Sequence, residues 1–227
     1  MPIPRTVAML TALTGLALFA PAFAPDSPKA GAPADTPAAS EGKLVPRTGL
    51  PVGWKAPDIE LRTAENEPVK VSDLLAKSDG PVVLIFYRGG WCPFCMKHLG
   101  DIEKHLDELK ALGATVVAVS PESPAHVAQT IEKIGAEYTV LSDPEMAAAM
   151  AYNLIFDVDP DTQKKYRGYG IELEDWNANG EWKLPVPALY VLDKDGVVRW
   201  AHVDEDYRKR VKGSDVVAAV REVKGKD

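Results

Sequence analysis

The sequence predicts an α/β domain with a central mixed β-sheet flanked by helices. Residues 82–87 are continuously apolar, and an amphipathic stretch then leads to a second apolar run at residues 115–119. This order predicts a strand, a helix and a second strand parallel to the first. Near the end of the chain, residues 193–196 read Asp-Lys-Asp-Gly between two apolar segments, which predicts an antiparallel hairpin. The only two cysteines, Cys92 and Cys95, stand at the start of the first helix.

The N-terminus has the order of a secretory signal peptide. Arg5 precedes an uncharged apolar run over residues 6–20, and small residues follow. The run is shorter than the ~20 residues that a membrane-spanning helix needs. Cleavage is expected after Ala22, since a cut after Ala24 would place Pro25 next to the scissile bond. Residues 1–22 are therefore predicted to direct export, to the periplasm, with an uncleaved membrane anchor as the alternative.

Residues 23–49 are rich in Ala and Pro, have few large apolar side chains, and predict a flexible linker. Residues 50–227 then predict one domain with enough chain for a core. The formal net charge of −7 argues against a nucleic-acid partner, because phosphate binding favours a basic face.

The strands and the helix expected before the cysteines are predicted from alternating apolar and polar residues and from turn-forming residues. Short strands are expected at 59–61 and 69–71, as an N-terminal β extension, and a brief helix over 72–77 with Ser72 as its N-cap. Residues 82–87 predict a central strand covered on both faces, because such strands are continuously apolar.

After the cysteines, one amphipathic helix is expected up to residue 112. Ser123 predicts the cap of the next helix, because Pro follows it at the first helical position. The remaining elements before the insertion are a strand at 138–141 and a helix from residue 143 to about 151. Residues 152–184 are aromatic without a clear period and predict an irregular insertion that packs on the domain. Strands at 188–192 and 197–200 and a last helix capped by Ser214 complete the chain.

The two cysteines point to redox chemistry rather than to a structural bridge. A disulfide between Cys92 and Cys95 would close a very short loop and stabilise the fold little. A thiol at a helix N-terminus faces unpaired N–H groups and the positive end of the helix dipole, which favour the reactive thiolate. Cys92 is expected at the more exposed position as the attacking thiolate, and Cys95, one turn later, as the covered resolving thiol.

Several stretches resemble one family. The matching sequences are Gly-Trp-Lys-Ala-Pro-Asp at 53–58, Phe-Tyr-Arg-Gly-Gly-Trp-Cys-Pro-Phe-Cys at 86–95, Leu-Pro-Val-Pro-Ala at 184–188 and the turn at 193–196. From residue 50 onward the chain resembles the alkyl hydroperoxide reductase and thiol-specific antioxidant (AhpC/TSA) family, in a peroxiredoxin-like branch of the thioredoxin superfamily with a Cys-x-x-Cys site.

The resemblance implies a thioredoxin-like fold and a thiol-dependent peroxidase. Hydrogen or organic hydroperoxides would be reduced through a Cys92/Cys95 thiol–disulfide cycle, and a thioredoxin-like donor would reduce the bridge. The resemblance also implies a cis-proline, Pro187, beside the cysteines. No cofactor is implied.

The chain departs from the usual peroxiredoxin pattern at two places. In an ungapped overlay, Arg88 replaces Pro, Cys92 replaces Thr, and Cys95 takes the peroxidatic position. Pro187 stands roughly where an Arg is usual. The overlay leaves open that Cys95 attacks and Cys92 resolves. It also leaves a second function, a periplasmic thiol–disulfide oxidoreductase that acts on protein disulfides.

Residues around the cysteines suggest supporting roles. The charge of Arg88 could lower the thiolate pKa or hold a peroxide oxygen, with a solvent-exposed arginine as the alternative. Gly89 and Gly90 are expected to bring backbone N–H groups near the sulfur. Trp91 is expected to shield the disulfide.

A third possible function is a metal-binding module. His98 follows Cys95 by three residues, so the two cysteines and this histidine could ligate a metal, although three ligands at this spacing are a weak signal. An exposed histidine without a metal is the expectation.

Overall fold

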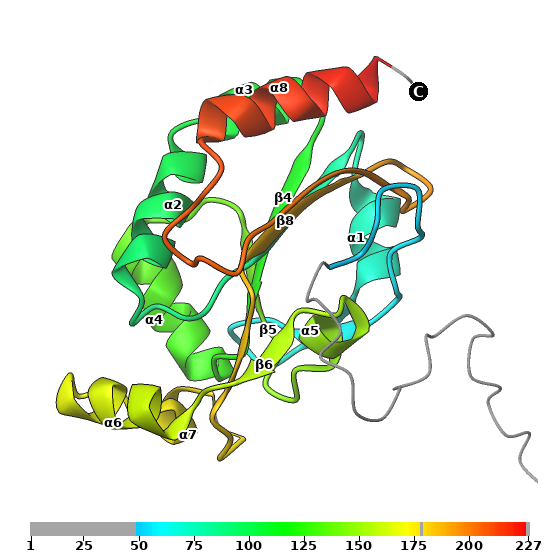
Figure 1. Ribbon diagram of the computed structural model, residues 1–227. Helices are drawn as coiled ribbons and strands as arrows, with labels where there is room; N and C mark the ends of the chain where they lie inside the picture. The colour runs from blue at the N-terminus through cyan, green and yellow to red at the C-terminus, as the bar shows by residue number, and fades with distance from the viewer. Residues whose placement is uncertain (1–48, 178, 226–227) are drawn as a thin grey trace, which may run out of the picture. The chain divides into compact units, whose positions relative to one another are not determined.

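A computed structural model describes residues 49–177 and 179–225, and the predicted signal peptide and almost all of the predicted linker lie outside these ranges. The described residues form the predicted α/β fold around a mixed seven-stranded sheet in the order β2-β1-β5-β4-β3-β8-β9 (Figure 1). Its strands are β1 (Glu60–Arg62), β2 (Pro68–Lys70), β3 (Val82–Phe86), β4 (Thr115–Ser120), β5 (Thr139–Ser142), β8 (Ala188–Leu192) and β9 (Val198–Val203).

Strand β3 lies at the centre of the sheet. It pairs parallel with β4, where Leu84 is opposite Val117, and antiparallel with β8, where Leu84 is opposite Tyr190. All five residues of β3 are buried, because helices cover both faces of the sheet. The predicted parallel unit is therefore confirmed, and the antiparallel pairing of β8 with β9 confirms the predicted hairpin.

Helices cover the two faces unequally (Figure 1). One face packs against α2 (Pro93–Glu103), α3 (Leu106–Ala111), α4 (Pro124–Ile134) and α8 (Gly213–Lys224), and the other against α1 (Val71–Lys77) and α5 (Ala147–Ala151). The cysteines belong to the core of the first face. They lie where β3 ends and α2 begins, at the carboxyl end of the two parallel strands.

The single helix predicted after the cysteines is instead two helices, α2 and α3. The break falls at Lys104 and His105, and His105 has φ −107° and ψ 6°. Its ring Nδ1 lies 2.9 Å from the carbonyl oxygen of Asp101, while its backbone N–H donates to Ile102. The His105 ring thus contacts the carbonyl oxygen of Asp101, which in a continuous α-helix would accept from the backbone N–H of His105.

Two predicted helix caps are wrong and one is confirmed. α1 and α8 begin one residue before Ser72 and Ser214, so these serines lie inside the first turn. The backbone N–H and hydroxyl of Ser72 donate instead to Asp58, at 2.9 and 3.1 Å. Ser123 caps α4 as predicted, accepting from the N–H of His126.

The insertion is more regular than the sequence predicts. It holds β6 (Ile155–Asp157), α6 (Pro160–Gly168), α7 (Leu173–Trp176) and β7 (Lys183–Pro185), and β6 and β7 form a separate two-stranded sheet. Val158, Leu173 and Leu184 are buried in a small core of their own, which explains how a stretch without a clear period becomes ordered. No helix in the described parts of the chain is both long enough and apolar enough to span a membrane.

Candidate active site

The two thiols lie in contact at the start of α2. Cys92 is the N-cap residue and Cys95 lies in the first turn. The Cys95 thiol donates to the Cys92 sulfur at 2.8 Å, and the Cys95 backbone N–H donates to the same sulfur at 3.4 Å. Both cysteines are free. A disulfide needs a sulfur separation of about 2.05 Å, so a small approach of the two sulfurs would form it.

Cys92 was predicted to be the more exposed of the two cysteines, but the structure buries both almost completely. The exposed fraction of Cys92 is 1%, against 0% for Cys95. Trp91 packs against the core cluster that holds both thiols, and its ring contacts that of Tyr166 from the insertion at a centroid distance of 5.3 Å. The cover comes partly from a segment more than 70 residues away in the chain, which local spacing does not show. The prediction that Trp91 shields the thiols agrees with this packing.

The surroundings separate the pKa values of the two thiols. The pKa of Cys92 is lowered to about 6, chiefly by the hydrogen bond from Cys95 and also by the charges of Arg88 and Arg210. Burial raises the pKa of Cys95 well above its usual value, and a thiolate at Cys92 raises it further. At neutral pH, Cys92 therefore carries the thiolate and Cys95 keeps its proton.

The reactivity of Cys92 should titrate near pH 6. Because its pKa is lowered, the thiolate fraction rises from roughly one tenth at pH 5 to roughly nine tenths at pH 7. We expect alkylation of reduced protein by iodoacetamide, located by peptide mass, to follow this curve at Cys92. Arg88→Gln should move the midpoint upward, since the charge that favours the thiolate is lost. A wild-type midpoint above pH 8 would contradict the geometry.

Arg88 is buried rather than exposed, with 3% of its surface accessible. Its guanidinium lies 4.1 Å from the ring centre of Tyr207, 5.0 Å from that of Trp91 and 5.7 Å from that of Tyr166. It also donates a hydrogen bond to the Tyr166 hydroxyl. The rings of Trp91, Tyr166 and Tyr207 thus form an aromatic cage around the Arg88 guanidinium. This cage keeps the positive charge of Arg88 near Cys92.

The buried carboxyl group of Glu122 holds the loop before the cysteines. Glu122 follows β4 and is completely buried. It accepts from the Gly90 N–H and the Tyr87 hydroxyl, each at 2.8 Å, and from the Ser120 hydroxyl at 3.0 Å. The Thr130 hydroxyl adds bonds of 3.2 and 3.3 Å. Burial raises the pKa of Glu122 although these bonds oppose the shift.

Gly90 has a different role from the one predicted. Its N–H donates to Glu122 and not to a cysteine sulfur, while its carbonyl accepts from Lys133 Nζ at 2.8 Å. A Cβ at this position would lie 2.2 Å from Thr130 Oγ1, so only glycine fits this close approach. The loop is therefore held through both backbone polar groups of Gly90.

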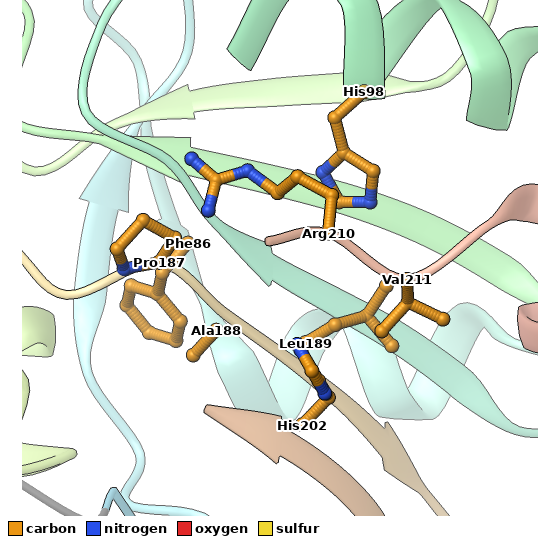
Figure 2. Close-up of a pocket in the computed structure, with 8 residues that line it drawn as sticks. All are labelled: Phe86, His98, Pro187, Ala188, Leu189, His202, Arg210 and Val211. Carbon is orange, nitrogen blue, oxygen red and sulfur yellow. The ribbon is translucent and has the colours of Figure 1, made fainter. Parts of the chain in front are cut away.

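Arg210 approaches the thiols from the loop between β9 and α8. Its Nη2 lies 3.5 Å from the Cys95 sulfur. With His98 and Pro187 it lines a cavity of about 10 Å³, which is room for roughly one water molecule. The side chain of Arg210 reaches over this cavity toward Pro187, and His98 enters from α2 (Figure 2).

Two predictions about this neighbourhood are wrong. The peptide bond before Pro187 is trans, because the described residues contain no cis peptide bond. Only about 5% of the peptide bonds before proline in folded proteins are cis, so the prediction rested on the family resemblance alone. His98 was expected to be exposed, but only 7% of its surface is accessible, because the segment before α8 covers it. The part of the chain that the structure describes contains no group of three or more His, Cys, Asp or Glu placed to hold a metal.

Three residues of the site are not predicted from the sequence: Glu122, Tyr207 and Arg210. The position of Glu122, two residues after a buried parallel strand, was a usable signal, because such positions lie at the edge of the sheet where sites form. No sequence signal points to Tyr207 or Arg210, since both stand in a charged loop about 115 residues from the cysteines.

Residues 52–201 match the profile of the AhpC/TSA family. A putative peroxiredoxin Bcp of Haemophilus influenzae is 32% identical over 105 residues, which are 46% of this chain and 66% of that protein. The peroxiredoxin Bcp of Bacillus subtilis is 30% identical over 119 residues, 52% of this chain and 73% of that protein. The matched segment thus spans about two thirds of these relatives.

Solved structures share the fold. Reduced Prx3 of Vibrio vulnificus, in complex with hydrogen peroxide, superposes with a TM-score of 0.60 at 20% identity and covers 75% of this chain and 99% of that one. The peroxidoxin BcpB of Mycobacterium tuberculosis gives a TM-score of 0.59 at 20% identity and covers 76% and 97%. At these identities the likeness establishes a thioredoxin-like, peroxiredoxin-type fold.

Proposed function

This chain belongs to the AhpC/TSA family, and we propose that it is a thiol-dependent peroxidase that reduces hydrogen or organic hydroperoxides. One observation carries the proposal most directly: a Cys92 sulfur with a lowered pKa lies 2.8 Å from a protonated Cys95 thiol. A peroxidase that forms its disulfide within one chain needs this pair, a thiolate that attacks and a thiol that resolves.

The residues support a balanced two-step cycle. The Cys92 thiolate attacks one peroxide oxygen, the O–O bond breaks, and the departing oxygen leaves as water or an alcohol after taking up a proton. Cys92 is then a sulfenic acid. The Cys95 sulfur attacks it, the S–O bond breaks, and water leaves with the thiol proton. The product is the Cys92–Cys95 disulfide.

Three groups assist this cycle by position. The cage holds the Arg88 charge where it favours the thiolate, and Arg210 lies against Cys95, whose thiolate must form transiently during resolution. Glu122 positions the loop through Gly90. We assign the attack to Cys92, since its pKa is the lowered one. An outside thiol, such as a thioredoxin-like donor, must then reduce the bridge.

The decisive test is the reaction of fully reduced protein with hydrogen peroxide. We expect loss of both free thiols with a mass decrease of two hydrogens, at a rate several orders of magnitude above that of a free small thiol at the same pH. Rapid mixing followed by acid quench and mass spectrometry measures both. A rate equal to that of the small thiol, together with rapid turnover of a protein disulfide, would replace the peroxidase with a thiol–disulfide oxidoreductase.

A further inference from the structure

A second cavity, much larger than the first, adjoins the cysteine pair. This basic cleft has a volume of about 520 Å³, within the range of small-molecule sites. It lies between α2 and the segment that leads from β9 into α8. Its lining residues are Phe94, Lys97, His98, Asp101, Lys104, Arg208, Arg210, Val211 and Lys212.

The charge of the basic cleft opposes that of the chain. Five of its lining side chains are cationic and one, Asp101, is acidic, in a protein of net charge −7. The Asp101 carboxylate already accepts from the N–H of Gly213 at 2.8 Å. Arg208 pairs with Asp206 at 2.7 Å. The four remaining cations have no ion-pair partner among the described residues: Lys97, Lys104, Arg210 and Lys212.

A buried polar atom also lines the basic cleft. His98 has 93% of its surface covered, and its Nε2 has no hydrogen-bond partner in the described part of the chain. Burial lowers the pKa of His98 to about 4, so its ring is neutral at pH 7. Buried polar atoms are nearly always hydrogen-bonded. This Nε2 has almost no accessible surface, so a ligand or a water would reach it only after a movement of the His98 ring or of its neighbours.

Arg210 connects the basic cleft with the redox centre. Arg210 lines the cleft and also lies 3.5 Å from the Cys95 sulfur, and Phe94 lines it from between the two cysteines. An anion held by Arg210 therefore has its neighbouring atoms a few ångströms from the sulfur pair. Phe94 and Val211 offer apolar surface to the uncharged part of such a molecule.

We propose that the basic cleft binds a small carboxylate-bearing thiol and that this thiol reduces the Cys92–Cys95 disulfide. The inference rests on the proposed function, because it concerns the second half of the same cycle. Unpaired cations favour carboxylates, and a volume of about 520 Å³ is that of a small-molecule site. Small carboxylate-bearing thiols would thus be a second class of reductant, besides a thioredoxin-like protein.

The reduction balances in two steps. A thiolate of the reductant bonds to one sulfur of the bridge while the Cys92–Cys95 bond breaks, and the electron pair stays on the other sulfur. A second thiolate displaces the protein sulfur from this mixed disulfide. The products are the protein dithiol and a small disulfide, so two electrons pass to the protein.

The test compares an anionic and a neutral thiol on protein whose disulfide is formed with diamide. Mercaptosuccinate and 2-mercaptoethanol are used, and each rate is divided by the rate of the same thiol with a small disulfide. We expect mercaptosuccinate to be favoured by about tenfold or more at low salt, since charge complementarity raises association rates by about 10- to 1,000-fold. High salt should weaken the preference.

Charge reversal locates the effect. Lys97→Glu with Lys104→Glu should remove the preference for mercaptosuccinate and leave the rate with 2-mercaptoethanol within about twofold. The matched control is Lys77→Glu with Lys194→Glu, which changes the net charge equally. These two lysines are exposed and lie on the α1 side of the sheet, where Gly196 meets Leu75. The control should keep the preference.

Binding is measured separately with succinate, which has no thiol. Titration calorimetry should show binding to the wild type and the control, and an affinity at least about tenfold weaker for the cleft variant. No preference for mercaptosuccinate in the wild type, or a preference unchanged by Lys97→Glu and Lys104→Glu, would overturn the proposal. The proposal would also be overturned if a carboxylate-bearing hydroperoxide were preferred over a neutral hydroperoxide while mercaptosuccinate were not preferred over 2-mercaptoethanol. None of the thiol measurements needs peroxide, so they succeed or fail independently of the peroxidase assay.

Discussion

Replacing Cys92 by serine abolishes the reaction with hydrogen peroxide. The thiolate at this position is the group that attacks, and a serine hydroxyl is not ionised near neutral pH. We expect the rate of peroxide consumption to fall by about 10³-fold or more. Peroxide decay measured by rapid mixing, with the mass of the protein followed in parallel, reports the loss. Circular dichroism should remain unchanged, because serine replaces a sulfur by a smaller oxygen at a helix N-cap that accepts it.

The matched variant is Cys95→Ser, which removes the resolving thiol and keeps the attacker. It should still consume one equivalent of peroxide and gain the mass of one oxygen as a Cys92 sulfenic acid. The pKa of Cys92 should rise, since the hydrogen bond from Cys95 is its largest cause of lowering. The opposite result, in which Cys92→Ser reacts rapidly and Cys95→Ser does not, would assign the attack to Cys95.

Replacing Glu122 by alanine should strongly destabilise the protein. The change leaves four buried donors without their acceptor: the N–H of Gly90 and the hydroxyls of Tyr87, Ser120 and Thr130. It also leaves a cavity beneath the cysteine loop. We expect the free energy of unfolding, from urea titration, to fall by about 3–5 kcal/mol. A loss below about 1 kcal/mol would mean that the loop does not depend on this carboxyl group.

Glu122→Gln is the conservative control and carries a pH signature. The amide oxygen can still accept from Gly90, so the loss at neutral pH should be smaller, about 1–2 kcal/mol. The folded pKa of Glu122 is raised. Its protonated form therefore contributes stability that is complete below the unfolded pKa of about 4.3 and is lost as the pH rises through the folded value. The difference in stability between wild type and Glu122→Gln should thus be largest at low pH and shrink as the pH rises.

Hydrophobic period and turn chemistry were sufficient to predict much of the fold. Residues 82–86 form a central strand because an uninterrupted apolar run is stable only where both faces are covered. The spacing of the two cysteines after that strand predicted a thiol pair at a helix start. These are local patterns, and local patterns determine which element a segment forms.

Long-range contacts account for the burial that the patterns did not predict. The burial of Cys92 and Arg88 depends on Tyr166 and Tyr207, which reach the site from the insertion and from the segment before α8. The trans bond before Pro187 corrects an expectation taken from a family resemblance. The break between α2 and α3 depends on the side chain of His105, which a pattern of apolar spacings does not weigh.

The sequence alone thus predicted an α/β redox protein and pointed to Cys92 and Cys95 as its reactive pair, because strand period, helix period and cysteine spacing are local properties of the chain. The separation of the two thiol pKa values, the cage around Arg88, the support from Glu122 and the basic cleft beside Arg210 arise only in the folded protein. The cage, the support from Glu122 and the basic cleft depend on residues that are distant in sequence. The pKa separation combines the hydrogen bond between two neighbouring cysteines with burial by the fold and with the charge of the distant Arg210, and the strength of each effect is set by distance and burial.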